Sequence, residues 1–204
     1  MLLMLSAAAG ADDWLPKLQP GGRLDDPWST AGTAKPDMFS MSHLLIINAA
    51  KGSWWEKAND LPYWLQRPFG PESATIELEL EFDPGPGAEQ AGMALFYDAE
   101  NYVKLVREFT SQHVVAFCSE TAGTGKPHLI TPARPTRLTL RLDRRGPVVA
   151  ASYQAGAGKP FIQIGNCRLP ASDKPLMLAI YAQASKNRSA PLAATFFSLQ
   201  VTPR

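Results

Sequence analysis

Polar side chains that could bind a ligand alternate along two neighbouring segments, residues 90–97 and 102–109. Side chains two positions apart in an extended strand lie on the same face, which groups Gln90 with Phe96 and Lys104 with Glu108. An amide, an ammonium and a carboxylate together can hydrogen-bond the hydroxyls of a small polar ligand. The pattern leaves two hypotheses open. This face is either a solvated outer surface or one wall of a ligand-binding groove.

Aromatic residues are concentrated in residues 52–70, which hold three of the five tryptophans of the chain. The group consists of Trp54, Trp55, Tyr63, Trp64 and Phe69. An exposed indole face suits the axial C–H groups of a sugar ring, which is the functional interpretation. The alternative is a packing cluster that holds this loop against the protein core. In the strand expected at 63–67, Gln66 shares a face with Trp64.

Catalysis has few candidate residues in this chain. A glycosidase needs two carboxyl groups that face each other across a cleft. Glu108 is the best single candidate because it lies on the face that would form the groove, and Glu56 or Asp60 could supply the second group. We expect Lys104 to form an ion pair with Glu108 rather than to transfer protons. The three histidines occur in no hydrolase or metalloprotease motif.

The two cysteines, Cys118 and Cys167, match neither a zinc site nor a C-x-x-C redox pair. Whether they form a disulfide stays open, because spacing in the sequence does not give their separation in space. No loop is dense enough in acidic residues for calcium. We therefore expect no metal and no cofactor.

Short apolar runs separated by proline and glycine, of which the chain has 18 and 15, predict an all-β protein. A hairpin joins the two segments around Asp98–Asn101. No 3.6-residue helical period is evident, and the close spacing of the strands favours a sandwich or a barrel. The other strands are expected at 43–50, 63–67, 74–82, 113–119, 127–131, 137–143, 147–154, 160–165, 175–183 and 192–202.

Two of these strands carry complementary charges on their polar faces. Leucine and isoleucine alternate with glutamate at 77, 79 and 81, and leucine alternates with Arg137 and Arg141 in the second strand. Antiparallel pairing would place the two stripes opposite each other. We interpret the three glutamates as solvated sheet surface rather than as catalytic acids.

Residues 1–11, MLLMLSAAAGA, are typical of the hydrophobic region and cleavage site of a secretory signal peptide, although the positive region before them is missing. Residues 12–37 are expected to be an irregular leader that packs on the core, and residues 38–204 to be the β-sandwich. With a net charge of +1, the chain has no strong field for nucleic acid. No segment reaches the length of a membrane span.

The motif Gln90-Ala91-Gly92 is followed by Asn101-Tyr102-Val103-Lys104 and then by Glu108. Together these motifs resemble concanavalin A-like jelly-roll domains. The group includes the "regulation of enolase" family of uncharacterised proteins, and the C-terminal sandwich domains of bacterial β-xylosidases are similar. The resemblance covers roughly residues 40–202. Ser198-Leu199 stands where the family often has an acidic pair, which removes a possible calcium ligand.

The resemblance implies two antiparallel sheets, one of them curved into a concave face that binds glycans in many relatives. On that basis the concave sheet would be lined by Trp55, Trp64, Gln66, Gln90, Lys104, Glu108 and Tyr181. The first hypothesis is therefore an exported, non-catalytic, lectin-like module that binds an oligo- or polysaccharide. The alternatives are a glycoside hydrolase or lyase that uses Glu108, and a structural or partner-binding sandwich without a sugar ligand. The oligomeric state stays open.

Overall fold

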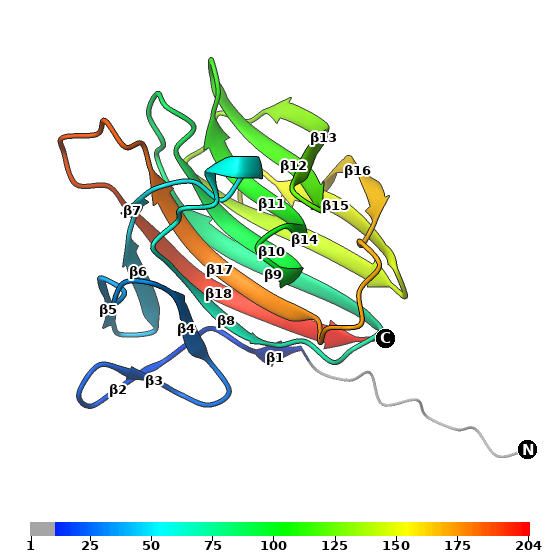
Figure 1. Ribbon diagram of the computed structural model, residues 1–204, viewed down its shortest axis with the longest axis horizontal. Coiled ribbons are helices and arrows are strands. Elements are labelled where there is room, and N and C mark those ends of the chain that lie inside the picture. Colours follow the sequence, from blue (N-terminus) through cyan, green and yellow to red (C-terminus); the bar gives the residue numbers. More distant parts are fainter. Residues whose placement is uncertain (1–10) are drawn as a thin grey trace, which may run out of the picture.

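Two eight-stranded sheets packed against each other make up the computed structural model, which describes residues 11–204 (Figure 1). The predicted all-β class and the sandwich of two sheets are confirmed. The one helical element of residues 11–204 is a single 3-10 turn, η1 (Glu56–Ala58). No helix in this part of the chain is long and apolar enough to cross a bilayer. The predicted signal segment lies outside the described residues, apart from Ala11.

The first sheet carries the complementary charges. The two charged strands are antiparallel neighbours, as predicted; Arg141 lies opposite Glu77, and its Nε donates to the Glu77 carboxylate at 2.7 Å. Arg137 and Glu79 form a second ion pair of 2.8 Å. The strands of this sheet, in spatial order, are β16 (Ile162–Arg168), β15 (Val148–Gln154), β14 (Arg137–Arg145), β9 (Ser73–Glu81), β18 (Ala193–Pro203), β6 (Leu44–Asn48) and β5 (Met38–Met41), with β1 (Asp12–Asp13) paired to β18.

The second sheet contains the predicted hairpin, which forms with the expected pairing of faces. Gln90 lies opposite Glu108, and Ala94 lies opposite Lys104. All pairings in the sheet are antiparallel except that of β7 with β17. Its strands, in spatial order, are β13 (Thr124–Pro132), β12 (His113–Thr121), β11 (Asn101–Phe109), β10 (Gln90–Asp98), β17 (Met177–Ala184), β8 (Tyr63–Pro68) and β4 (Ser29–Gly32), with β7 (Ala50–Lys51) beside β17.

The core lies between the sheets and follows from the two-residue period of the strands. Leu78 of β9 and Leu105 of β11 are fully buried examples from the two facing surfaces. Burial of apolar surface is worth about 25 cal/mol per Å² and is the main force that holds the sheets together. Because alternate residues of β10, β11 and β12 point into this core, the others must point to the outer face of the second sheet.

Residues 12–37 contain short strands as well as loops. β1 and β4 pair with the two sheets, and β2 (Leu18–Gln19) with β3 (Arg23–Leu24) forms a separate ribbon. Trp28 is buried, and its indole N–H donates to the carbonyl of Trp14 at 2.8 Å. Cys118 and Cys167 are both free thiols.

A close backbone approach makes Gly92 a sensitive position of the second sheet. A Cβ at this position would lie 2.8 Å from the Cα of Val106 and would overlap the Leu105 carbonyl oxygen. We expect Gly92→Ala to separate β10 from β11 and to lower the free energy of unfolding by about 1–3 kcal/mol.

Urea unfolding tests this, with Gly70→Ala as the matched control. No atom lies within 4 Å of a Cβ built at Gly70. We expect the control to change stability by less than about 0.5 kcal/mol. Equal unfolding midpoints for the two variants would contradict the argument.

Candidate functional site

Buried polar side chains gather on the outer face of the second sheet. Gln90, Lys104, Glu120 and Gln183 are each at most 3% exposed, and the strand register places all four on this face. A buried polar group that lacks a hydrogen-bond partner destabilises the folded protein by several kcal/mol. The partners of these four side chains therefore define what the face does.

One partner is the loop that precedes and includes η1, which crosses the second sheet in Figure 1. The backbone N–H of Trp54 donates to Gln183 Oε1 at 3.0 Å, and Lys104 Nζ donates to the Trp54 carbonyl at 2.8 Å. The backbone N–H of Glu56 donates to a carboxylate oxygen of Glu120 at 2.7 Å. The sheet thus holds the loop through its own polar side chains.

The hydroxyl of Tyr102 completes this arrangement. It lies 2.7 Å from Glu120 Oε2 and 2.8 Å from the Trp54 carbonyl oxygen, but it has a single proton to donate. The charged carboxylate is the stronger acceptor, so the proton goes to Glu120. The Trp54 carbonyl is then left to Lys104. Burial raises the pKa of Tyr102, and the hydrogen bond to Glu120 raises it further, so the phenol stays protonated.

The indole of Trp54 is buried among aromatic rings. It stacks on Trp64 with centroids 4.9 Å apart, and it also contacts Phe96, Tyr102 and Tyr181. Of the two interpretations of the tryptophan cluster, the packing one applies to Trp54 and Trp64. These rings cover part of the outer face.

An uncovered hollow of about 310 Å³ remains beside this loop. We call it the Trp55 hollow, because the indole of Trp55 forms one wall. The ring rests on the backbone of β13 at Gly125, where any Cβ would overlap it, and Lys104 Nζ lies 4.8 Å from the ring centroid. The lining consists of Ser53, Trp55, Ala88, Gln90, Lys104, Glu108, Thr110, Cys118, Pro127 and Ile130.

Glu108 is the one lining carboxylate, and it is half-buried. Among residues 11–204 it accepts no hydrogen bond and joins no ion pair. Burial raises the pKa of Glu108, and the nearby charge of Lys104 opposes that shift. Its oxygens are therefore available as acceptors for a ligand.

Lys104 does not form the ion pair with Glu108 that the sequence led us to expect. Four positions along a strand separate the two backbones by roughly 13 Å, and the Lys104 ammonium is directed to the Trp54 carbonyl. Burial lowers the pKa of Lys104 to about 8, against weaker upward contributions from Cys118, Glu108 and Glu120. The thiol of Cys118 lies opposite Lys104, and burial raises its pKa to about 11. A neutral thiol of this kind is a poor nucleophile.

Gln90 is oriented by Tyr181, which lies on the neighbouring strand β17. The Tyr181 hydroxyl donates to Gln90 Oε1 at 2.7 Å, and this bond directs the amide nitrogen away from Tyr181. Tyr181 itself is only 1% exposed. Among the described residues the amide nitrogen of Gln90 donates to no group, so the hollow contains a free donor beside the free acceptor of Glu108.

The structure thus brings together four of the seven sequence-predicted site residues, Trp55, Gln90, Lys104 and Glu108. Tyr181 is hydrogen-bonded to Gln90 and does not line the hollow, and Trp64 stacks on Trp54. Gln66 accepts the indole N–H of Trp64 at 3.1 Å and does not line the hollow. Glu120 and Gln183 were not predicted from the sequence. The strand period places both on the right face, but only the loop contacts show their use.

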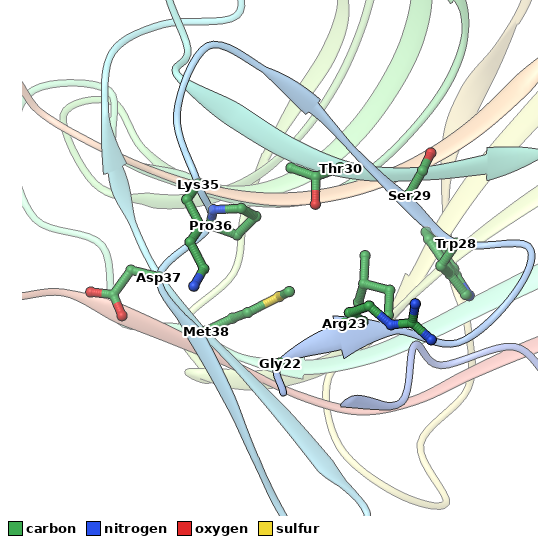
Figure 2. A pocket seen from close by; sticks show the side chains of 10 residues that line it. Gly22, Arg23, Trp28, Ser29, Thr30, Lys35, Pro36, Asp37 and Met38 are labelled. Atoms are coloured by element: carbon green, nitrogen blue, oxygen red, sulfur yellow. The ribbon is translucent and has the colours of Figure 1, made fainter. Parts of the chain in front are cut away.

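A second hollow, of about 490 Å³, lies between β4, β5 and the β2–β3 ribbon (Figure 2). Lys35 and Met38 reach into it from one side, and Arg23 lies across from them. Lys35 and Arg23 are exposed, and no buried polar residue within 11–204 lines this space. No cluster of three or more potential metal ligands occurs in the same range. We therefore place the candidate site in the Trp55 hollow.

Comparisons with known proteins give the family. The family described as "Beta xylosidase C-terminal Concanavalin A-like domain" matches residues 21–198. No curated protein matches the chain. Likeness to solved structures is a likeness of fold, because sequence identities are below 20% in the three comparisons that follow.

A GH43 protein from Bacillus licheniformis is 17% identical, with a TM-score of 0.70 over 79% of this chain and 33% of its own. A xylan β-1,4-xylosidase from Bacillus halodurans is 12% identical, with a TM-score of 0.66 over 78% of this chain and 32% of its own. A functionally unknown protein from Saccharomyces cerevisiae is 12% identical, with a TM-score of 0.67 over 87% of this chain and 96% of its own. The chain therefore spans about a third of the length of the two bacterial proteins.

The lowered pKa of Lys104 predicts a pH-dependent contribution to stability. Between pH 8 and about 10.5 the unfolded chain holds a proton on this lysine that the folded chain has lost. Wild type should therefore gain stability relative to Lys104→Met as the pH rises through this window, by something on the order of 3 kcal/mol at most. Urea unfolding of both proteins at pH 7.5 and 10.5 measures the gap. A gap that does not change with pH would show that Lys104 keeps its ordinary pKa.

Proposed function

The chain belongs to the family of β-xylosidase C-terminal concanavalin A-like domains, and from this premise we propose that it is a non-catalytic module that binds a glycan in the Trp55 hollow. The observation that carries the proposal is the pairing of a free acceptor, Glu108, with a free donor, the amide of Gln90, beside one indole wall. Such a mixture of apolar surface and a few directional polar groups is typical of small-ligand sites.

The size of the hollow supports a small sugar portion as the ligand. Ligand pockets span about 300–1,000 Å³, and a volume of about 310 Å³ is at the lower end of that range. Apolar side chains and the Trp55 indole offer surface for C–H groups, while Glu108 and Gln90 offer hydrogen bonds to hydroxyls. The name of the Bacillus halodurans relative makes xylan a reasonable first polysaccharide to test.

A binding role is favoured over hydrolysis because Glu108 lacks a suitably placed carboxyl partner. Glu120 shares its face, but it is six residues along β12 from Val114, which lies opposite Glu108. At about 3.3 Å per residue this is roughly 20 Å, whereas glycosidase carboxyl pairs are about 5–9.5 Å apart. Glu120 also already accepts hydrogen bonds from Tyr102 and from the backbone of Glu56.

The other two sequence candidates do not supply the second carboxyl group either. Asp60 pairs with Lys186 and accepts a hydrogen bond from the backbone of Ser53, and Lys186 lowers its pKa. Glu56 is exposed and does not line the Trp55 hollow. Hydrolysis or lysis through Glu108 is the alternative function, and the experiment below separates it from binding.

Export is part of the proposal. It is supported by the apolar run and small-residue site of residues 1–11. An extracellular or periplasmic location suits a module whose ligand is a polysaccharide. The narrower kinship with the "regulation of enolase" family, suggested by Gln90-Ala91-Gly92 and Asn101-Tyr102-Val103-Lys104, is proposed on those motifs alone.

A screen of soluble xylan, arabinan, mannan and β-glucan tests the function, with tryptophan fluorescence reporting binding and a reducing-end assay reporting hydrolysis. We expect binding without release of reducing ends. Trp55→Ala should weaken binding by roughly ten-fold or more, since a lost aromatic contact costs on the order of 1.4 kcal/mol. Phe39→Ala is the matched control, because Phe39 is 48% exposed on β5 of the other sheet.

Glu108→Gln separates the alternatives. If the site only binds, this variant should bind several-fold more weakly, and neither protein should release reducing ends. Release by wild type that Glu108→Gln eliminates would replace the binding proposal with the enzymatic one. Absence of any glycan response would leave the partner-binding alternative.

A further inference from the structure

Two hollows meet at the same tryptophan. Besides the Trp55 hollow, a second space of about 510 Å³ lies between η1 and the turn that joins β12 to β13. We call it the η1 hollow. It is lined by Ser53, Trp55, Glu56, Ala58, Gly123 and Thr124. Ser53 and Trp55 belong to both linings, so the two spaces are neighbours with a shared wall.

That shared wall is held in place from several sides. The backbone of Gly125 supports the indole of Trp55. The residues on either side of Trp55 are fixed by the hydrogen bonds from Lys104 Nζ to the Trp54 carbonyl and from the Glu56 N–H to Glu120. A ligand that extends past Trp55 therefore meets a positioned side chain rather than a loose one.

The two hollows also follow one direction of the sheet. The Trp55 hollow reaches Glu108, which lies opposite Val114 of β12. The η1 hollow reaches Thr124, which lies opposite Thr121 at the other end of the same strand. The seven residue-to-residue steps from 114 to 121 span roughly 23 Å at about 3.3 Å per step. This length exceeds that of a single sugar ring and suits several linked units.

We propose that the ligand is an internal segment of a linear glycan, with one part in the Trp55 hollow, the next part in the η1 hollow, and the Trp55 indole between them. This inference rests on the proposed function and makes it more specific. It identifies the substrate class as extended chains rather than monosaccharides or chain ends.

Chain-length dependence of affinity is the test. The probes are monosaccharides and oligosaccharides of two to six units from the xylan, cellulose, mannan and arabinan series, titrated by calorimetry. In the series that binds, we expect affinity to rise by roughly ten-fold or more from the shortest ligand to the one that fills both hollows, and then to level off. Affinity that does not depend on length would overturn the inference and leave the proposed function intact.

A substitution that fills the η1 hollow tests whether that hollow binds part of the ligand. Thr124 is exposed and lines only the η1 hollow. Thr124→Trp should remove most of the gain for long chains and leave the affinity for the shortest binding ligand unchanged. Thr33→Trp, at an exposed threonine that lines neither hollow, is the matched control and should behave as wild type.

The remaining outcomes are also decisive. Equal loss of affinity for short and long chains in Thr124→Trp would mean that the η1 hollow does not act as a separate subsite. Retention of the full gain for long chains in this variant would place the additional units elsewhere. Failure of every series to bind wild type would overturn both the inference and the proposed function.

Discussion

The burial of Trp54 on the outer face of a sheet is the constraint on which the site depends. Its indole can pack against four aromatic rings only if its backbone N–H and carbonyl, buried with it, find partners. Gln183 and Lys104 supply those partners. The cost of burying an ammonium group is visible in the lowered pKa of Lys104. The position of Trp55 follows directly, because it is the next residue of the anchored loop.

Polar residues of the outer face thus divide into three roles. Lys104, Glu120 and Gln183 hold the loop, and Tyr181 orients another side chain. The carboxylate of Glu108 and the amide nitrogen of Gln90 line the hollow, and neither has a hydrogen-bond partner among residues 11–204. Most of the buried polar groups of this face are therefore used within the protein, and a single carboxylate is available to a ligand in the hollow. With one carboxylate in the hollow, ligand binding is favoured over glycoside hydrolysis, which needs two cooperating carboxyl groups.

Two glycines permit the close contacts around this face. Gly92 lets β10 approach the backbone of β11, and Gly125 lets the Trp55 indole lie directly on β13. A Cβ at Gly92 would overlap the backbone of β11, and a Cβ at Gly125 would overlap the Trp55 ring, which borders both hollows. Gly92 is part of the Gln-Ala-Gly motif, so its presence has a packing reason as well as a family resemblance.

The sequence by itself determined the all-β class, the main strands and the face on which each alternate side chain lies, because the two-residue period of a strand is a local property. It also indicated that the strand with the arginine stripe would be the antiparallel neighbour of the strand with the glutamate stripe, whereas the register that places Arg141 opposite Glu77 comes from the structure. Only the tertiary structure decided which members of the tryptophan cluster are accessible. Trp54, Trp55 and Trp64 have the same chemistry in sequence, and their roles differ because one loop crosses the sheet, buries Trp54 against Trp64 and leaves Trp55 at the edge of a hollow. The ion pair expected between Lys104 and Glu108 does not form, and the group to which the Lys104 ammonium is directed, the Trp54 carbonyl, is fifty residues away in the chain.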